Sequence, residues 1–151
     1  RDRTPYALDS RSDVKVLLAE PSYLDEIAQL HQQAFSDAEE TLEASRRYIT
    51  EALKDSDGLL YILLKEAQVI GVCTVDLSGN NNYLYGLAVA EAYRGQGYGS
   101  YLAKSVVNQL IAQNDKSFQI AVEDSNVGAK RLYEKIGFVK QTQVVYLKQK
   151  E

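Results

Sequence analysis

The feature that most constrains this chain is a glycine-rich loop between an apolar strand and a long amphipathic helix. Residues 83–89 predict the strand, residues 94–99 form the loop, and residues 98–113 predict the helix. The first turn of a helix has unpaired amide N–H groups and the positive end of the dipole, and glycines let phosphate oxygens approach closely. Arg94 adds a full positive charge beside the loop. The stretch therefore predicts a site for a pyrophosphate group.

Length and composition indicate one globular domain. The chain has 151 residues, of which 45% are hydrophobic and 25% are charged. We expect residues 1–13 to be a tail or a linker and residues 14–151 to form a single domain.

The net charge of −4 argues against a nucleic-acid partner and suits a cationic substrate. Apolar runs are too short to predict a membrane span, and the single Cys73 fits a cytoplasmic location without an intrachain disulfide.

Hydrophobic periodicity predicts a mixed α/β fold. Residues 14–19 predict a first strand, and residues 59–64 and 69–75 predict a hairpin that leads into the strand at 83–89. Helical spacing covers residues 22–35, 38–54, 98–113 and 126–136. Residues 118–122 predict a strand parallel to 83–89, because the long helix would be a crossover connection, and residues 138–148 predict extended chain.

Two common functions of a glycine-rich loop, in a P-loop and in a dinucleotide-binding fold, do not match this sequence. A phosphate-binding P-loop needs a Lys after its last glycine, and no Lys occupies that position. A dinucleotide fold uses a tight turn between the strand and its glycines, whereas five residues, 90–94, separate them in this chain. Glu123 would be the ribose-binding acid in that fold, but the chain is too short for two mononucleotide-binding halves.

A third use agrees with more of the chain. The loop Arg94-Gly95-Gln96-Gly97-Tyr98-Gly99 resembles the Arg/Gln-x-x-Gly-x-Gly/Ala signature of the Gcn5-related N-acetyltransferase (GNAT) superfamily, which binds the pyrophosphate of acetyl-coenzyme A. A second motif follows in the expected order, and it consists of Asn126, Ala129, Leu132, Tyr133 and the pair Gly137-Phe138. The resemblance implies a GNAT-like splayed, largely antiparallel sheet of six to seven strands flanked by about four helices.

The resemblance also implies a reaction and a set of site residues. The reaction is transfer of an acetyl group from acetyl-CoA to a primary amine by direct attack, with no metal. A backbone N–H of the strand at residues 87–89 would stabilise the charge on the carbonyl oxygen, and Tyr133 would protonate the leaving thiolate. The cofactor-binding positions that the resemblance implies are Leu87, Ala88, Val89, Arg94, Gly95, Gln96, Gly97, Tyr98, Gly99, Ser100, Asn126, Ala129 and Tyr133.

Several roles stay open at this stage. Gly86 predicts either a bulge where two sheet halves separate or simple relief of packing. Tyr133 fits a general acid and also a core aromatic side chain, and Asn126 fits a helix cap as well as a contact to the pantetheine arm. Relatives often carry a carboxylate base on the central strand, where this chain has Tyr83 and Tyr85.

The candidates for the general base are Glu123, Asp76 or a water molecule relayed through a tyrosine hydroxyl. His31 is interpreted as a surface residue, and without other His or Cys partners it predicts no metal site.

The expected acceptor is a small-molecule amine or a peptide or protein amine. The alternative to a transferase is a non-catalytic acyl-CoA-binding module or half of a tandem GNAT protein. A homodimer or a tandem-domain partner is compatible with both the transferase and this alternative.

Overall fold

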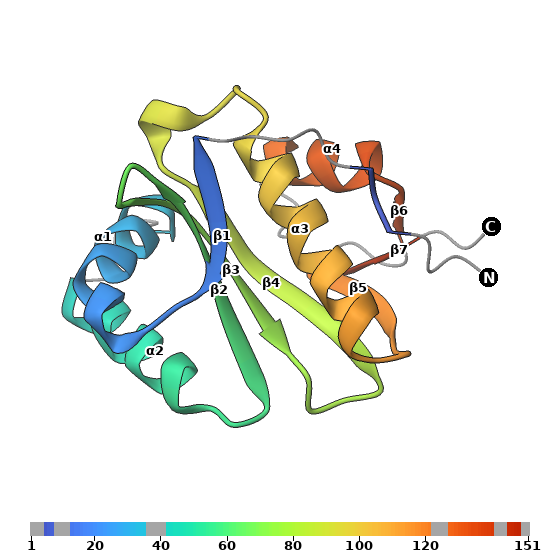
Figure 1. Ribbon diagram of the computed structural model, residues 1–151, viewed down its shortest axis with the longest axis horizontal. Helices are drawn as coiled ribbons and strands as arrows, with labels where there is room; N and C mark the ends of the chain where they lie inside the picture. The colour runs from blue at the N-terminus through green and yellow to red at the C-terminus, as the bar shows by residue number, and fades with distance from the viewer. Residues whose placement is uncertain (1–4, 8–12, 36–41, 122–126, 141–144, 149–151) are drawn as a thin grey trace.

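The computed structural model describes residues 5–7, 13–35, 42–121, 127–140 and 145–148. Four α-helices and one mixed sheet confirm the predicted mixed α/β class (Figure 1). The helices are α1 (Leu24–Phe35), α2 (Leu42–Lys54), α3 (Tyr98–Gln113) and α4 (Val127–Lys135). The strands are β1 (Val14–Leu18), β2 (Gly58–Lys65), β3 (Gln68–Asp76), β4 (Asn81–Val89), β5 (Ser117–Ala121), β6 (Phe138–Lys140) and β7 (Val145–Lys148). Two 3₁₀ turns, Pro21–Tyr23 and Glu91–Tyr93, precede α1 and follow β4.

The strands form one sheet in the order β1-β2-β3-β4-β5-β7-β6. Only the pair β4–β5 is parallel among the strands that the structure describes, and α3 connects these two strands as predicted for a crossover. The other neighbours pair antiparallel, so the sheet is largely antiparallel. The segment 38–41, predicted as the first turn of the second helix, lies outside the described residues.

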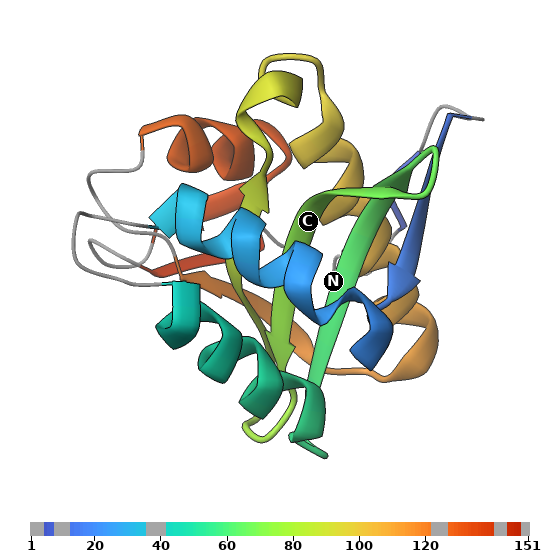
Figure 2. The same cartoon turned by 90° about the vertical axis from the view of Figure 1, so that its left-hand side faces the viewer.

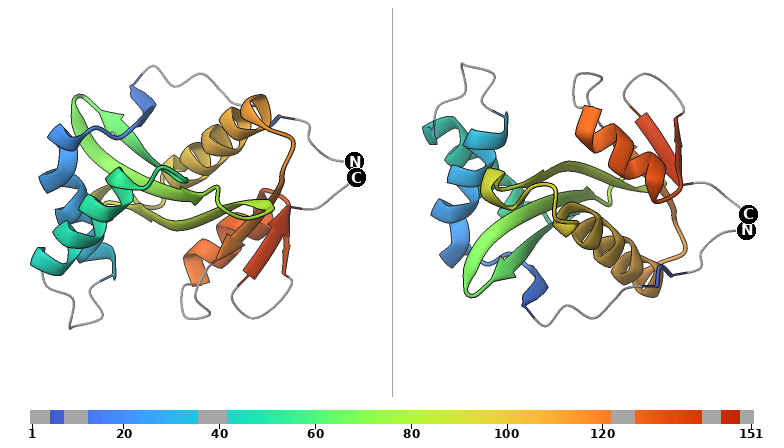
Figure 3. Two further views of the ribbon diagram at one scale, coloured as in Figure 1. Left: turned by 90° about the horizontal axis from the view of Figure 1, so that it is seen from below. Right: turned by 90° about the horizontal axis from the view of Figure 1, so that it is seen from above.

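The two faces of the sheet bury separate cores because side chains alternate along each strand. On one face Leu63 and Leu84 pack with Leu102 and Val106 of α3. On the other face the strands pack against α1 and α2, and the buried side chains there include Ile27, Leu30, Ile49, Leu60, Ile62 and Val72. Figures 2 and 3 show α1 and α2 side by side on one face of the sheet and α3 on the opposite face. The central strands are therefore covered on both faces.

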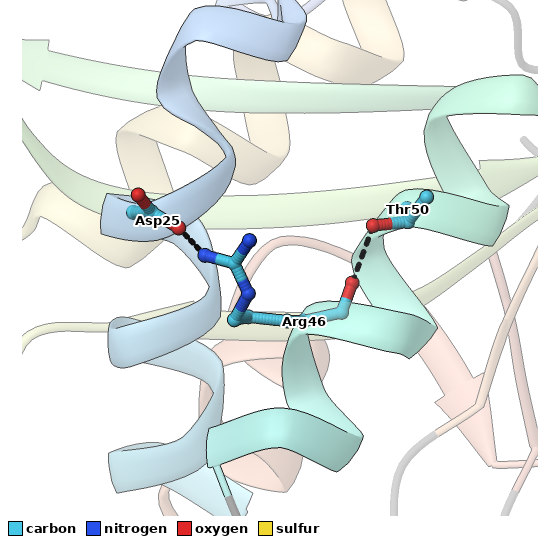
Figure 4. A network of polar contacts seen from close by, with 3 residues as sticks. All are labelled: Asp25, Arg46 and Thr50. Atoms are coloured by element: carbon cyan, nitrogen blue, oxygen red, sulfur yellow. Dashed lines mark hydrogen bonds and ion pairs between the residues drawn. The ribbon is translucent and has the colours of Figure 1, made fainter.

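A polar contact joins the two helices of the second face. The guanidinium group of Arg46 on α2 forms an ion pair with the carboxylate of Asp25 on α1 (Figure 4). The Thr50 hydroxyl donates a hydrogen bond of 2.7 Å to the backbone carbonyl oxygen of Arg46, one turn earlier. Because both partners of the ion pair are solvent-exposed, it contributes little to stability.

Tyr6, in the segment interpreted as a tail or linker, contacts α3. Its backbone N–H donates to Asn108 Oδ1 at 2.7 Å, and Asn108 Nδ2 donates to its carbonyl oxygen at 3.0 Å. The Tyr6 hydroxyl donates to the Ile136 carbonyl oxygen at 2.6 Å. Residues 5–7 thus connect the crossover helix α3 with the end of α4.

Candidate active site

The strand β4 contains a bulge at Gly86. Val72 of β3 pairs with Ala88, and Thr74 pairs with Tyr85, so two residues of β4 lie opposite the single residue Cys73. Gly86 has φ of +67°, the left-handed conformation that glycine adopts most readily at such a bulge. The bulge interpretation of Gly86 is therefore confirmed, and it turns the second half of β4 relative to the first.

Beyond the bulge, β4 has no registered pairing with β5. The parallel register runs from Asn81 opposite Ser117 to Leu84 opposite Ile120, and among the described residues it goes no further. The segment from Tyr85 to Val89 retains β3 on its other side. Among the described residues, no strand pairs with the other edge of this segment, and such an edge is where an extended ligand can add to a sheet.

The loop after β4 leads to the N-terminus of α3. Gly95 and Gly97 have φ of +77° and +85°, and both are exposed. Gly97 is the N-cap of α3, no side chain caps this end, and the first turn holds no acidic residue. Consecutive amides in this geometry form a concave donor site for an anion. Arg94 is exposed, and its Nε donates to the Val89 carbonyl oxygen at 3.0 Å, which fixes the guanidinium group beside the loop.

The remaining loop positions have different surroundings. The Gln96 side chain donates to the Ala92 carbonyl oxygen at 3.3 Å. Tyr98 is only 4% exposed and its hydroxyl donates to Asp13 at 3.0 Å, so its backbone amide, but not its ring, faces the anion site. A Cβ at Gly99 would lie 3.0 Å from Leu132 Cδ1, so Gly99 allows close contact between α3 and α4. Ser100 is half-buried in the first turn of α3.

A pocket of about 360 Å³ lies between the end of α1 and the end of β4. Its lining is Leu30, Gln32, Gln33, Val89, Ala90, Glu91 and Arg94. The predicted positions Leu87 and Val89 are half-buried, and Ala88 is 7% exposed in the core under α1. The end of β4 and the base of the glycine loop thus border one cavity.

Tyr133 on α4 is buried, with 1% of its surface exposed. Its ring meets Phe138 edge to face, with centroids 5.9 Å apart. Burial raises the pKa of the Tyr133 phenol well above its ordinary value, and the Cys73 thiol adds to this shift. Because Cys73 lies opposite the bulge of β4, the Tyr133 phenol approaches the sheet where β4 leaves its pairing with β5.

The structure gives less information on four other predicted site residues. Glu123 and Asn126 lie outside the described residues, and Ala129 is described only as a backbone position of α4. Hydrogen bonds from the Ser78 hydroxyl and backbone lower the pKa of the Asp76 carboxyl. A carboxylate with a lowered pKa is a weaker base, which disfavours Asp76 in that role.

The interpretation of His31 as a surface residue is wrong. Its side chain is 9% exposed between α1 and α2, its Nδ1 lies 3.2 Å from the Ser45 hydroxyl, and its ring stacks on Tyr48 at 4.7 Å. Tyr48 also shares a side-chain hydrogen bond with Tyr85 of β4. Helical spacing could have placed Ser45 and Tyr48 on one face of α2, but the contacts to His31 and Tyr85 depend on how the helices pack.

No group of three or more metal-ligating side chains occurs within the part of the chain that the structure describes. None of the described helices combines the length and the apolar character needed to cross a membrane.

The geometry defines a class of protein. A glycine-rich anion site at a helix N-terminus, placed at the end of a strand that separates from its parallel neighbour, suits an extended ligand with a phosphate group. The acetyltransferase (GNAT) family matches residues 24–138. This chain belongs to that family of acetyltransferases.

Individual proteins are also similar to this chain. The [ribosomal protein bS18]-alanine N-acetyltransferase of Haemophilus ducreyi is 30% identical over 89 residues, which are 57% of this chain and 61% of that protein. The match thus spans about three-fifths of the curated relative. A transcriptional regulator from Bacillus halodurans has a TM-score of 0.75 at 20% identity, over 85% of this chain and 95% of that one. The PaiA N-acetyltransferase of Thermoplasma acidophilum, solved with coenzyme A, has a TM-score of 0.71 at 13% identity, over 91% and 99% of the two chains. These structures share the fold.

Proposed function

We propose that this chain transfers an acetyl group from acetyl-CoA to a primary amine by direct nucleophilic attack. The observation that carries the proposal is the position of the bulge. The bulge at Gly86 follows the last described pair of β4 with β5, at Leu84, and β4 then leads through the glycine loop to the anion site at Gly95 and Gly97. A thioester beside the second half of β4 and a diphosphate at the start of α3 would then belong to one elongated ligand.

The anion site fits the diphosphate of coenzyme A. An added Cβ at Gly95 would meet nothing within 4 Å, so the loop leaves room for phosphate oxygens. The uncapped amides of α3 supply hydrogen-bond donors, and Arg94 supplies a positive charge. The proposed cofactor contacts are the backbone amides of the loop, including those of Gln96, Tyr98 and Ser100. The proposed contacts from Asn126 and Ala129 rest on the motif alone.

The second half of β4 fits the reacting thioester. When the amine nitrogen bonds to the carbonyl carbon, negative charge develops on the carbonyl oxygen. A backbone N–H in the segment of Leu87, Ala88 and Val89 would stabilise this charge, because a preorganised donor needs no reorganisation during the reaction. The carbon–sulfur bond then breaks and the acetyl group stays on nitrogen as an amide.

Tyr133 is the proposed general acid. This role rests on the match of Tyr133 to the second motif; its phenol carries a proton at neutral pH that it can donate to the departing thiolate sulfur, and burial, which raises the phenol pKa, makes it a weaker acid than a free phenol. The amine must lose a proton in exchange, and Glu123 is the proposed acceptor of that proton on the sequence pattern alone. Protons balance, because one leaves the amine and one reaches the sulfur.

The acceptor class is a primary amine. By its name, the Haemophilus ducreyi relative acts on an alanine of a ribosomal protein, which supports a peptide amino group as one acceptor. The net charge of −4 favours positively charged acceptors in general.

Thiol release from acetyl-CoA across a panel of amines tests the proposal. We expect release that requires an amine and that matches the amount of amide formed, measured by mass spectrometry. Acetyl-CoA binding without amide formation from any amine would overturn the transferase proposal in favour of an acyl-CoA-binding module.

A further inference from the structure

Two tyrosines on β4 lie on the face of the sheet that α1 and α2 partly cover. Leu84 is buried in the core under α3, so alternation places Tyr83 and Tyr85 on the opposite face. Both are half-buried, and their ring centroids are 5.8 Å apart with an interplanar angle of 35°. The two rings thus form a continuous, partly exposed aromatic surface on β4.

Helix α2 extends this aromatic surface. Tyr48 is 38% exposed and shares a side-chain hydrogen bond with Tyr85, so the two hydroxyls meet between α2 and β4. The buried ring of His31 stacks behind Tyr48 and orients it. We call Tyr48, Tyr83 and Tyr85 the tyrosine cluster.

Two carboxylates, Asp76 and Asp55, act on the tyrosine cluster. Asp76 of β3 pairs directly with Tyr83, and it lies on the same face because Thr74, two residues earlier, pairs with Tyr85. Burial raises the pKa of Tyr85, Tyr48 adds to the shift, and the charges of Asp76 and Asp55 act in the same direction. Lys116 is the cation near Asp76, and its ammonium group donates to the carbonyl oxygens of Leu77 and Gly79 at 2.6 and 2.9 Å.

This combination suits one kind of ligand. The faces of tyrosine rings carry negative electrostatic potential and attract ammonium groups, and nearby carboxylates strengthen that attraction. A neutral or anionic ligand would gain nothing from these charges. Tyr85 directly precedes the bulge, so with a rise of about 3.3 Å per residue it lies within roughly 7 Å along the strand from Leu87.

We infer that the tyrosine cluster, with Asp76 and Asp55, binds the primary ammonium group of the acceptor before transfer, and that this group then releases one proton to solvent to become the attacking amine. This inference rests on the proposed function, since it places the amine beside the strand segment that would hold the thioester. A peptide N-terminus and a free alkylamine both carry a primary ammonium group, and the experiment compares these two acceptors.

The experiment measures KM and kcat for two acceptors, a short peptide with an N-terminal alanine and 1,4-diaminobutane. In Y85L the ring is lost, and we expect KM for the accepted amine to rise about fivefold or more, the size expected for a lost cation–π contact. In Y85F the ring remains, so KM should stay closer to the original value. D76N should raise KM for the amine, and the KM for acetyl-CoA should be unchanged in all three variants.

Y23L is the matched control, because Tyr23 is a half-buried tyrosine on the same face but outside the cluster. Unchanged amine KM in both Y85L and D76N, in folded proteins that transfer acetyl groups, would overturn the inference. The acceptor that shows the larger KM change identifies the source of the ammonium group.

Calorimetric titration with the same two amines, in the presence of coenzyme A, separates this inference from the proposed function. Amine binding that Y85L and D76N weaken, in a protein that transfers no acetyl group, would support the ammonium site and reject the transferase. Transfer that proceeds with unaltered amine binding in both variants would reject the ammonium site alone.

Discussion

Asn82 at the start of β4 and Asn114 at the C-cap of α3 exchange two side-chain hydrogen bonds. Asn82 Nδ2 donates to Asn114 Oδ1 at 3.0 Å, and Asn114 Nδ2 donates to Asn82 Oδ1 at 2.9 Å. Asn82 is fully buried. The reciprocal pair joins the beginning of the central strand to the end of the helix whose other end forms the anion site.

We expect N82A to lower the free energy of unfolding by about 1–3 kcal/mol, because it removes both side-chain hydrogen bonds to Asn114 in a part-buried position. Urea denaturation monitored by circular dichroism measures this change. N80A is the matched control, since Asn80 is exposed in the adjoining turn. Equal unfolding free energies for the two variants would contradict the stabilising role of the pair.

The conformation of Gly95 should be required for coenzyme A binding. G95A introduces a Cβ that meets no atom within 4 Å, so its cost is backbone strain at φ of +77°, on the order of 1 kcal/mol. We expect the loop to relax away from its anion-binding conformation and the dissociation constant for coenzyme A to rise about fivefold or more in calorimetry. G79A, also in open space, is the control. Equal affinities would show that the loop conformation is unimportant.

The hydroxyl of Tyr133 should matter for turnover more than for binding. We expect Y133F to lower kcat about 100-fold, the scale of a lost general acid, because the thiolate would leave without a proton donor. Coenzyme A affinity should stay within about twofold, since the buried ring keeps its contact with Phe138. Steady-state kinetics and calorimetry check the two parts, with Y23F as a control. An unchanged kcat would exclude Tyr133 as the acid.

The buried thiol of Cys73 should make stability fall at alkaline pH. Burial raises its pKa from 9.0 to about 12, so the unfolded chain ionises first and the folded state loses relative stability as pH rises through that window. Between pH 8 and 10.5 we expect the protein to lose about 2 kcal/mol more unfolding free energy than C73A does. Urea denaturation at the two pH values measures this difference. Parallel losses in both proteins would mean that Cys73 does not contribute.

Local sequence patterns were sufficient for most of the secondary structure. The strand at residues 83–89 and the helix starting at Tyr98 follow from hydrophobic spacing, whereas Gly86 allowed two interpretations until the register of β3 and β4 showed the bulge. The family resemblance follows from the same short motifs, whose residues lie close together in the chain.

Tertiary packing decided the rest. His31 becomes buried only because α1 and α2 pack together, and Tyr48 reaches Tyr85 only because α2 lies over the sheet. Likewise, the ring of Tyr98 turns into the core, and Tyr133 comes near Cys73 from a distant part of the chain. The sequence by itself determined the order of the helices and strands and the family motifs, because these depend on residues that are close together in the chain. Only the tertiary structure decided which side chains form the tyrosine cluster, because those contacts join segments that no local periodicity relates.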